Sequence, residues 1–211
     1  ISASVVAKAL EGVGVDHIIT MDLHAAQIQG FFNIPVDNLS SSKLFLPYIF
    51  QHRAEYGSDT VIVSPDVGGV SRARAIATAG QDIAIVDKRR PRAGASEVMN
   101  IVGNVEGRHC IIFDDIVDTA GTLCKAADAL IERGGASGVT ACITHGVLSG
   151  NALNNINNSK LSKLLITDSI PVPSSFVENC PKMTIISVAE TLAQVIALDA
   201  EGESLAGWQV Q

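Results

Sequence analysis

The run from His109 to Thr122 constrains the fold more than any other segment of this chain. It begins as an apolar, β-rich stretch with the length of a buried strand, and it ends in a polar loop. Residues 123–131 then have apolar side chains at helical spacing, and Gly134-Gly135 follow them. A strand, a loop and a helix in this order predict a crevice at the carboxyl edge of a parallel sheet, where such sheets bind ligands.

The polar loop contains the groups that would bind a sugar phosphate. Amide groups at the helix start, the hydroxyls of Thr119 and Thr122, and the close backbone approach that Gly121 allows favour a phosphate. The three carboxylates of the loop repel a phosphate and suit vicinal hydroxyls or a metal instead. The alternative is a simple helix cap, but a cap needs one acid or hydroxyl, and this loop has three acids and two threonines.

Strand-like and helical segments alternate along the chain. This pattern predicts an α/β fold built from right-handed βαβ units on a parallel sheet. The expected strands are 16–21, 59–64, 82–87, 109–113, 139–144, 163–167 and 182–188, and the expected helices are 2–11, 41–56, 70–79, 122–133, 150–157 and 189–199.

The composition is that of an enzyme domain with an aliphatic core. Apolar residues make up 47% of the chain and aromatic residues only 4%. The net charge of −7 argues against nucleic acid as a partner. The four cysteines show no metal-ligand pairing, and no apolar run reaches membrane-spanning length. We therefore expect a cytoplasmic protein without a nucleic-acid or membrane partner.

Two further segments bring acids to strand ends. Asp22 and His24 follow the first expected strand, and because side chains at i and i+2 share one face, they can converge on a metal or a phosphate. Asp66 follows the second, and Gly68-Gly69 beside it allow close backbone approach. A carboxylate such as Asp66 favours Mg²⁺, although a capping role in a turn is the alternative.

A basic run, Lys88-Arg89-Arg90-Pro91-Arg92, follows the third expected strand. Its simplest interpretation is a solvated loop. Because these side chains leave the same sheet edge as Asp66 and Asp114, they are also placed to stabilise phosphoryl charge. Lys88 and Arg90 are the pair that faces one site, since alternate residues of a strand point the same way.

The loop resembles the ribose-5-phosphate motif of the type I phosphoribosyltransferase family. Together with the other segments it resembles the ribose-phosphate diphosphokinase (PRPP synthetase) family over nearly the whole chain. The segments that carry this resemblance, in order, are Thr20–Asp37, Ser64–Gly69, Asp87–Arg92 with the following 96–100, Phe113–Thr122 and Thr144–Gly150.

The resemblance implies an activity and a set of roles. That family transfers the diphosphoryl group of ATP to the 1-hydroxyl of ribose 5-phosphate, with Mg²⁺, to give PRPP and AMP. By position, the resemblance assigns metal binding to His24, Asp66 and, less closely, Asp22. It assigns catalysis to Lys88 and Arg90. The positions that match ribose 5-phosphate binding are Arg90, Asp114, Asp115, Asp118, Thr119, Ala120, Gly121 and Thr122. Asn33 stands where an acid is common, which puts a metal role there in doubt.

The resemblance also implies an organisation of two phosphoribosyltransferase-like (Rossmann-like) domains. Residues 1–38 are expected to be the end of a truncated first domain, without most of the ATP adenine site, and 39–211 the second, with a last helix that can pack on either. The family implies a homo-oligomer, a hexamer, with phosphate or ADP as effectors. The alternatives are a non-catalytic regulatory paralogue, or a phosphoribosyltransferase that consumes PRPP.

Overall fold

The structure is a computed structural model that describes residues 2–57, 59–77, 81–89 and 98–209. The chain separates into two compact units, one formed by Ile1–Leu44 with Val188–Gln211 and the other by Phe45–Ser187. The sequence placed a boundary at 38/39 and left the last helix open. The structure divides the chain at 44/45 and at 187/188, so the last helix belongs to the first unit.

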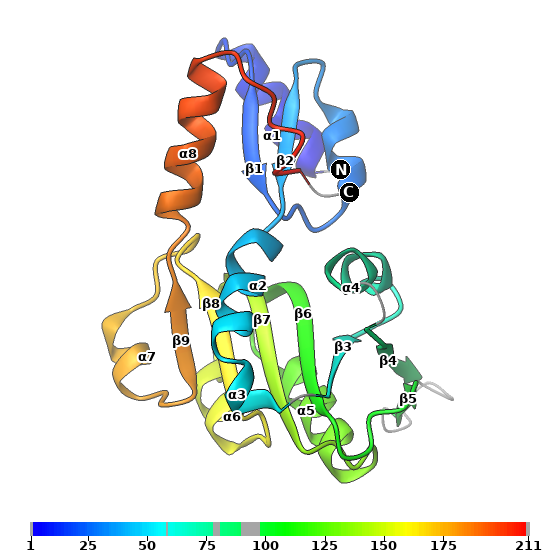
Figure 1. Ribbon diagram of the computed structural model, residues 1–211. Helices are drawn as coiled ribbons and strands as arrows, with labels where there is room; N and C mark the ends of the chain where they lie inside the picture. Colours follow the sequence, from blue (N-terminus) through cyan, green and yellow to red (C-terminus); the bar gives the residue numbers. More distant parts are fainter. Residues whose placement is uncertain (1, 58, 78–80, 90–97, 210–211) are drawn as a thin grey trace. The chain divides into compact units, whose positions relative to one another are not determined.

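The second unit is built on a seven-stranded sheet in the order β5-β4-β3-β6-β7-β8-β9 (Figure 1). Six strands are parallel, and β5 at the edge pairs antiparallel with β4. The strands are β3 (Thr60–Ser64), β4 (Ile83–Arg89), β5 (Val98–Val102), β6 (His109–Val117), β7 (Gly138–Gly146), β8 (Lys163–Thr167) and β9 (Met183–Ile186).

The strand order places a topological switch point between β3 and β6. From β3 the chain runs outward to β4 and β5, and it then returns to add β6 on the other side of β3. In such sheets the loops after the two central strands lead away in opposite directions and leave a crevice at their carboxyl ends. The two loops that border this crevice follow β3 and β6, the same loops to which the sequence assigns Asp66 and Asp118.

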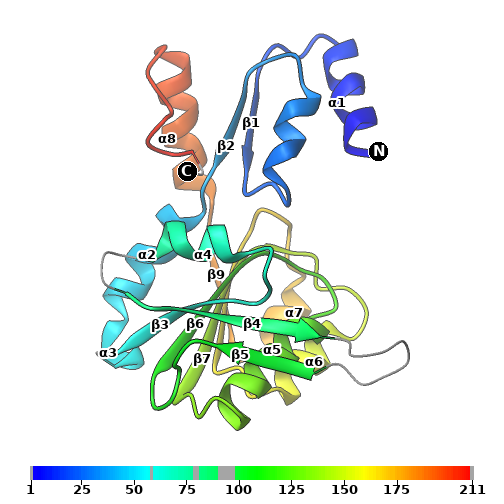
Figure 2. The same cartoon turned by 90° about the vertical axis from the view of Figure 1, so that its right-hand side faces the viewer.

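Helices cover both faces of this sheet (Figure 2). On one face lie α5 (Gly121–Glu132), α6 (Ala152–Asn158) and α7 (Ser174–Glu178); on the other lie α2 (Ser42–Gln51), α3 (Arg53–Tyr56) and α4 (Val70–Ile76). Alternate strand residues supply the two cores: Val61 and Ile112 pack with the first group of helices, and Ile62 and Ile111 with the second.

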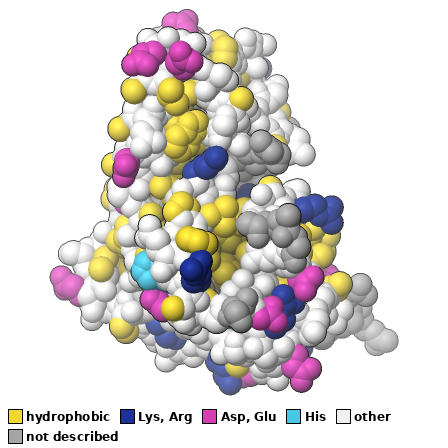
Figure 3. Space-filling view, viewed as in Figure 1, with side chains coloured by type: hydrophobic (Ala, Val, Ile, Leu, Met, Phe, Trp, Pro, Cys, Tyr) yellow, Lys and Arg dark blue, Asp and Glu magenta, His cyan; other side chains and the backbone are white. Residues whose placement is uncertain are grey.

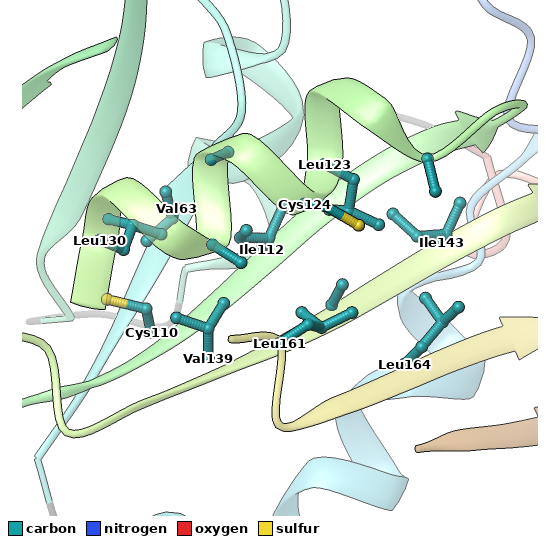
Figure 4. Close-up of a cluster of buried hydrophobic side chains, with 14 of the residues drawn as sticks. Val63, Cys110, Ile112, Leu123, Cys124, Leu130, Val139, Ile143, Leu161 and Leu164 are labelled. Atoms are coloured by element: carbon teal, nitrogen blue, oxygen red, sulfur yellow. The ribbon is translucent and has the colours of Figure 1, made fainter. Parts of the chain in front are cut away.

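The helix α5 fixes the position of the polar loop at its N-terminus. Its buried side chains include Leu123, Cys124 and Leu130, which face Ile112 and Val139 on the sheet (Figure 4). These apolar positions recur at helical spacing, so one side of the helix is buried and the other is polar. Packing over its full length therefore anchors the helix whose first turn borders the crevice.

The first unit contains a two-stranded parallel sheet of β1 (Ile18–Met21) and β2 (Val36–Leu39). Around it lie α1 (Ser2–Gly12), the 3₁₀ helix η1 (Ala26–Phe31) and α8 (Ala189–Ala200). Met21, Leu39 and Val195 are part of its buried core. No helix in the described part of the chain is long and apolar enough to cross a membrane.

The α/β class and the parallel sheet are confirmed, with differences at particular elements. The sequence did not predict β2 or β5, and it predicted a single helix over 41–56 where the structure has α2 and α3 on either side of His52. Where the sequence predicted a helix over 70–79, the structure has α4 (Val70–Ile76), and residues 78–80 lie outside the described part.

Candidate active site

The turn between β6 and α5 lines a small cavity at the carboxyl edge of the sheet. Its volume is about 200 Å³, and its lining residues are Pro65, Asp114, the run 116–123 and Ile143. Ala120, at the N-terminal cap of α5, has a φ of 60°, in the left-handed region. The amide groups of a helix's first turn have no partner within the helix, so this cavity presents donors and the positive end of a dipole to an anion.

A neighbouring loop and helix hold the turn in place. The backbone amide of Ser149 donates to the carbonyl oxygen of Asp118 at 3.1 Å, and the Ser149 hydroxyl also donates to the Asp118 carboxylate. Asn155 of α6 donates from Nδ2 to the carbonyl oxygen of Thr119 at 2.8 Å. In the sequence, Thr144–Gly150 stands out only as part of the family resemblance; the hydrogen bonds of Ser149 show that this segment also supports the turn.

The two adjacent acids of β6 share one cation. Arg72 of α4 donates from Nη1 to Oδ1 of Asp114 at 3.1 Å and to Oδ1 of Asp115 at 2.8 Å. The Asp114 carboxylate also accepts from the backbone amide of Asp115 at 2.9 Å. Asp114 is partly buried and lines the cavity, while Asp115 is only 3% exposed.

Burial raises the pKa of Asp114 above its ordinary value. The neighbouring carboxyl of Asp115 raises the pKa further, because two like charges so close disfavour ionisation of both. The guanidinium of Arg72 and the backbone amide of Asp115 act in the opposite direction. Arg72 therefore counteracts the mutual repulsion of the pair.

The turn after β3 borders the same switch point. Ser64 donates from its hydroxyl to the carbonyl oxygen of Asp66 at 2.7 Å, and Oδ1 of Asp66 accepts from the amide of Gly69 at 2.8 Å. A Cβ on Gly69 would lie 2.8 Å from the Ser64 hydroxyl oxygen, which explains the need for glycine. Asp66 itself is exposed.

Lys88, the first residue of the predicted catalytic pair, lies near the end of β4 (Ile83–Arg89). The backbone of Lys88 pairs with that of Met99 in β5. Arg90 lies outside the described residues, so the structure does not test its role in either catalysis or sugar-phosphate binding.

Asp22, His24 and Asn33 belong to the first unit. Asp22 directly follows β1 and has a φ of 41°. It is 5% exposed and accepts at Oδ2 from the amide of Ser41 at 3.2 Å. His24, two residues on, is exposed. Asn33 donates from Nδ2 to Glu11 at 3.0 Å, and its backbone amide donates to the other oxygen of the same carboxylate, so it joins the end of η1 to α1.

Within the described residues, no three His, Cys, Asp or Glu side chains form a group that could hold a metal ion. Asp22 and His24 lie in one unit and Asp66 in the other. Among the described residues, Asp66 is thus not part of a group of three such side chains. Mg²⁺ commonly completes its coordination with substrate phosphates and water.

A larger cavity of about 720 Å³ lies beside α2 and α3. Its lining is mostly apolar and contains no carboxylate; Leu46, Ile49, Phe50 and Ile111 are among the residues. Figure 3 shows hydrophobic side chains gathered over this part of the second unit. Size alone would favour this cavity, but only the smaller one has the donors and acids that a sugar phosphate needs.

A family model described as the phosphoribosyl synthetase-associated domain matches residues 59–208. The chain belongs to this family. The match contains the sheet, the loop after β6 and the turn after β3, so the candidate site lies within the phosphoribosyl synthetase-associated region.

Curated relatives and a solved structure agree with that assignment. The chain is 53% identical to the ribose-phosphate pyrophosphokinase of Xylella fastidiosa (strain Temecula1) over all of this chain and 65% of that protein. The Bordetella pertussis enzyme of the same name is 53% identical over 97% of this chain and 65% of its own length. The chain thus spans about 65% of these curated relatives.

The crystal structure of phosphoribosylpyrophosphate synthetase from Mycobacterium smegmatis is similar, with a TM-score of 0.85 and 37% identity. The similarity covers 95% of this chain and 64% of that one. This match confirms the fold class over both units.

Sequence reasoning missed Arg72. Arg72 stands three residues after Gly69, and nothing in the local sequence shows that its side chain reaches the neighbouring strand β6. The two adjacent acids of β6 could have indicated such a residue, because acids that are removed from water require a nearby cation.

Proposed function

We propose that this chain forms the sugar-phosphate part of a ribose-phosphate diphosphokinase. Such an enzyme transfers the diphosphoryl group of ATP to the 1-hydroxyl of ribose 5-phosphate and releases AMP. The observation that carries the proposal is the cavity after β6, where a helix N-terminus and hydroxyls adjoin an acid pair at the switch point of the sheet. Family membership and the names of the relatives support it.

In this proposal the substrate lies along the loop. Its 5-phosphate binds the amide groups and hydroxyls of 118–122 at the start of α5, where the helix dipole favours an anion. Its two ring hydroxyls donate to Asp114 and Asp115, since an ionised carboxylate is an acceptor only. The phosphate thus binds hydrogen-bond donors, and the ring hydroxyls bind acceptors. This difference fixes the orientation of the sugar in the site.

The transfer step needs positioning and charge neutralisation more than covalent chemistry. The 1-hydroxyl oxygen attacks the β-phosphorus in line, the bond from that phosphorus to the bridging oxygen of the α-phosphate breaks, and AMP leaves. We assign stabilisation of the charge that develops in this step to Lys88, near the end of β4, and to Arg90.

We assign Mg²⁺ binding to Asp66 in the second unit and, separately, to His24 and, less closely, Asp22 in the first unit. The exposed carboxylate of Asp66 is a hard oxygen donor of the kind that Mg²⁺ prefers. When bound, Mg²⁺ neutralises charge on the ATP phosphates. Asp22 fits this role least, because it is buried and its carboxylate holds the amide of Ser41.

We further propose that the first unit belongs to a larger phosphoribosyltransferase-like domain. A sheet of two strands has little stability of its own, and the curated relatives are longer than this chain. The family resemblance supports a homo-oligomer, with phosphate or ADP as effectors.

The test measures AMP and PRPP formation from ATP and ribose 5-phosphate, with Mg²⁺, by this chain extended to the length of its relatives. Lys88→Ala should lower kcat by about 100- to 1000-fold with little change in KM for ribose 5-phosphate. A folded extended enzyme that binds ribose 5-phosphate but forms no AMP would support the regulatory paralogue instead. Consumption of PRPP with a free base would support a phosphoribosyltransferase.

A further inference from the structure

The contact between Arg72 and the acid pair is unusual in its geometry. One guanidinium nitrogen, Nη1, donates to an oxygen of Asp114 and to an oxygen of Asp115. The three side chains are 21%, 29% and 4% exposed, so the contact is shielded from water and from salt. A surface ion pair contributes little, whereas a cation in this position decides whether two buried acids can both carry charge.

The electrostatic balance around the pair depends on charges of both signs. Asp118 lines the cavity beside Asp114, and Arg72 on α4 is the cation that donates to both acids and lowers the pKa of Asp114. Without it, repulsion and burial favour a proton on one of the two carboxylates.

A proton on the pair would change its use in sugar binding. A neutral carboxyl donates one hydrogen bond and accepts more weakly, while a carboxylate accepts charge-assisted bonds that are roughly twice as strong. Two vicinal hydroxyls that both donate are therefore bound more strongly when both carboxyls are ionised.

We propose that Arg72 is a positioning residue of the sugar site, which holds the carboxylates of Asp114 and Asp115 together and favours their ionised forms, so that the pair accepts hydrogen bonds from the two vicinal hydroxyls of ribose 5-phosphate. This inference rests on the proposed function. Arg72 does not touch the sugar in this account and acts only through the two acids.

The first experiment measures ribose 5-phosphate affinity by calorimetry from pH 6 to pH 9 for the 211-residue chain and three variants. Arg72→Gln should weaken binding at neutral pH by about tenfold or more, the effect of losing a charge-assisted acceptor. Its affinity should recover toward that of the unmodified chain as the pH rises and the acids ionise. Arg72→Lys should restore the pH profile, and Arg74→Gln, an exposed change on the same helix, should match the unmodified chain.

A second measurement needs no ligand. The carboxyl ¹³C resonance of Asp114 should titrate with a midpoint at least about one pH unit higher in Arg72→Gln than in the unmodified chain. If Arg72→Gln does not fold, Asp115→Asn provides the converse test, because removal of the like charge should lower that midpoint.

The outcomes separate the two claims. A chain that binds no ribose 5-phosphate overturns the proposed function and, with it, the role of Arg72 toward that sugar. A chain that binds it normally, with an Arg72→Gln variant of equal affinity and pH profile, overturns only the inference. An unchanged carboxyl midpoint in Arg72→Gln, or in Asp115→Asn, also overturns the inference.

Discussion

A hydrogen bond joins Asn155 in α6 to Thr119 in the turn before α5. Nδ2 of Asn155, in α6, donates to the carbonyl oxygen of Thr119 at 2.8 Å. Thr119 lies directly before Ala120, which has the left-handed φ. The bond therefore fixes the turn where the chain reverses into α5.

Replacement of Asn155 should weaken phosphate binding, although Asn155 acts only on the turn and does not contact the ligand. Asn155→Leu removes the neutral hydrogen bond to Thr119, worth about 0.5–1.5 kcal/mol, so ribose 5-phosphate affinity should fall about threefold to tenfold. It also removes a long 3.4 Å bond from Asn151, which is the N-cap residue of the same helix and does not lie in the turn. Calorimetry provides the measurement. Asn158→Leu is the matched control, because Asn158 bonds within its own helix, to Asn154. Equal affinities in the two variants would show that the turn does not depend on α6.

The sequence predicted the central strands β3 and β6 well, but it did not predict the peripheral strands β2 and β5. The apolar runs at 59–64 and 109–113 are buried on both faces, so composition alone identifies them as strands. In contrast, β2 contains Asp37 and Asn38, which favour turns, and it exists because it pairs with β1. Tertiary pairing overrode local preference there.

The site shows the same limit. Asp114 and the run 118–122 were identified because they are contiguous, and the structure places them along one cavity. Arg72 could not be identified in this way, since its partners are 42 and 43 residues away and its position depends on the order of β3 and β6. A local pattern carries no information about which strands are neighbours.

Stability should depend on pH through Asp114. Burial and Asp115 raise its pKa from 3.8 to about 7, so the folded chain binds this proton more tightly than the unfolded chain does. The stability from this group is therefore complete below pH 4 and is lost as the pH rises toward 7. In Asp114→Asn this decline should be smaller, and at pH 8 the variant should be more stable by on the order of 1 kcal/mol.

Urea unfolding at several pH values measures this effect. Asp118→Asn, at an exposed position of the same loop, is the control and should keep the pH dependence of the unmodified chain. If the free energy of unfolding declines with rising pH as much in Asp114→Asn as in the unmodified chain, a group other than Asp114 binds the proton.

Lys182 should contribute more to stability than an ordinary surface lysine. Its Nζ donates to the carbonyl oxygens of Ile156, Asn157 and Ser159, at 3.1, 3.1 and 2.7 Å, and so caps the C-terminal end of α6. Lys182→Met should cost about 1.5–3 kcal/mol, the range for hydrogen bonds to a charged group.

The comparison is Lys160→Met. Lys160 pairs with Glu132 at 3.1 Å, but both side chains are at least half exposed, so its loss should cost about 0–1 kcal/mol. Chemical denaturation of both variants gives the two values. A smaller loss for Lys182→Met than for Lys160→Met would contradict the capping role.

The central claim is that ribose 5-phosphate binds with its phosphate at the start of α5. The most direct test records backbone amide resonances of the chain during titration with ribose 5-phosphate, and with ribose as the control that lacks the phosphate. We expect saturable shifts of the amide resonances of Gly121, Thr122 and Leu123 with ribose 5-phosphate, and much smaller shifts of these three with ribose. If these amides do not move while the sugar phosphate binds elsewhere, or if it does not bind at all, the claim is wrong.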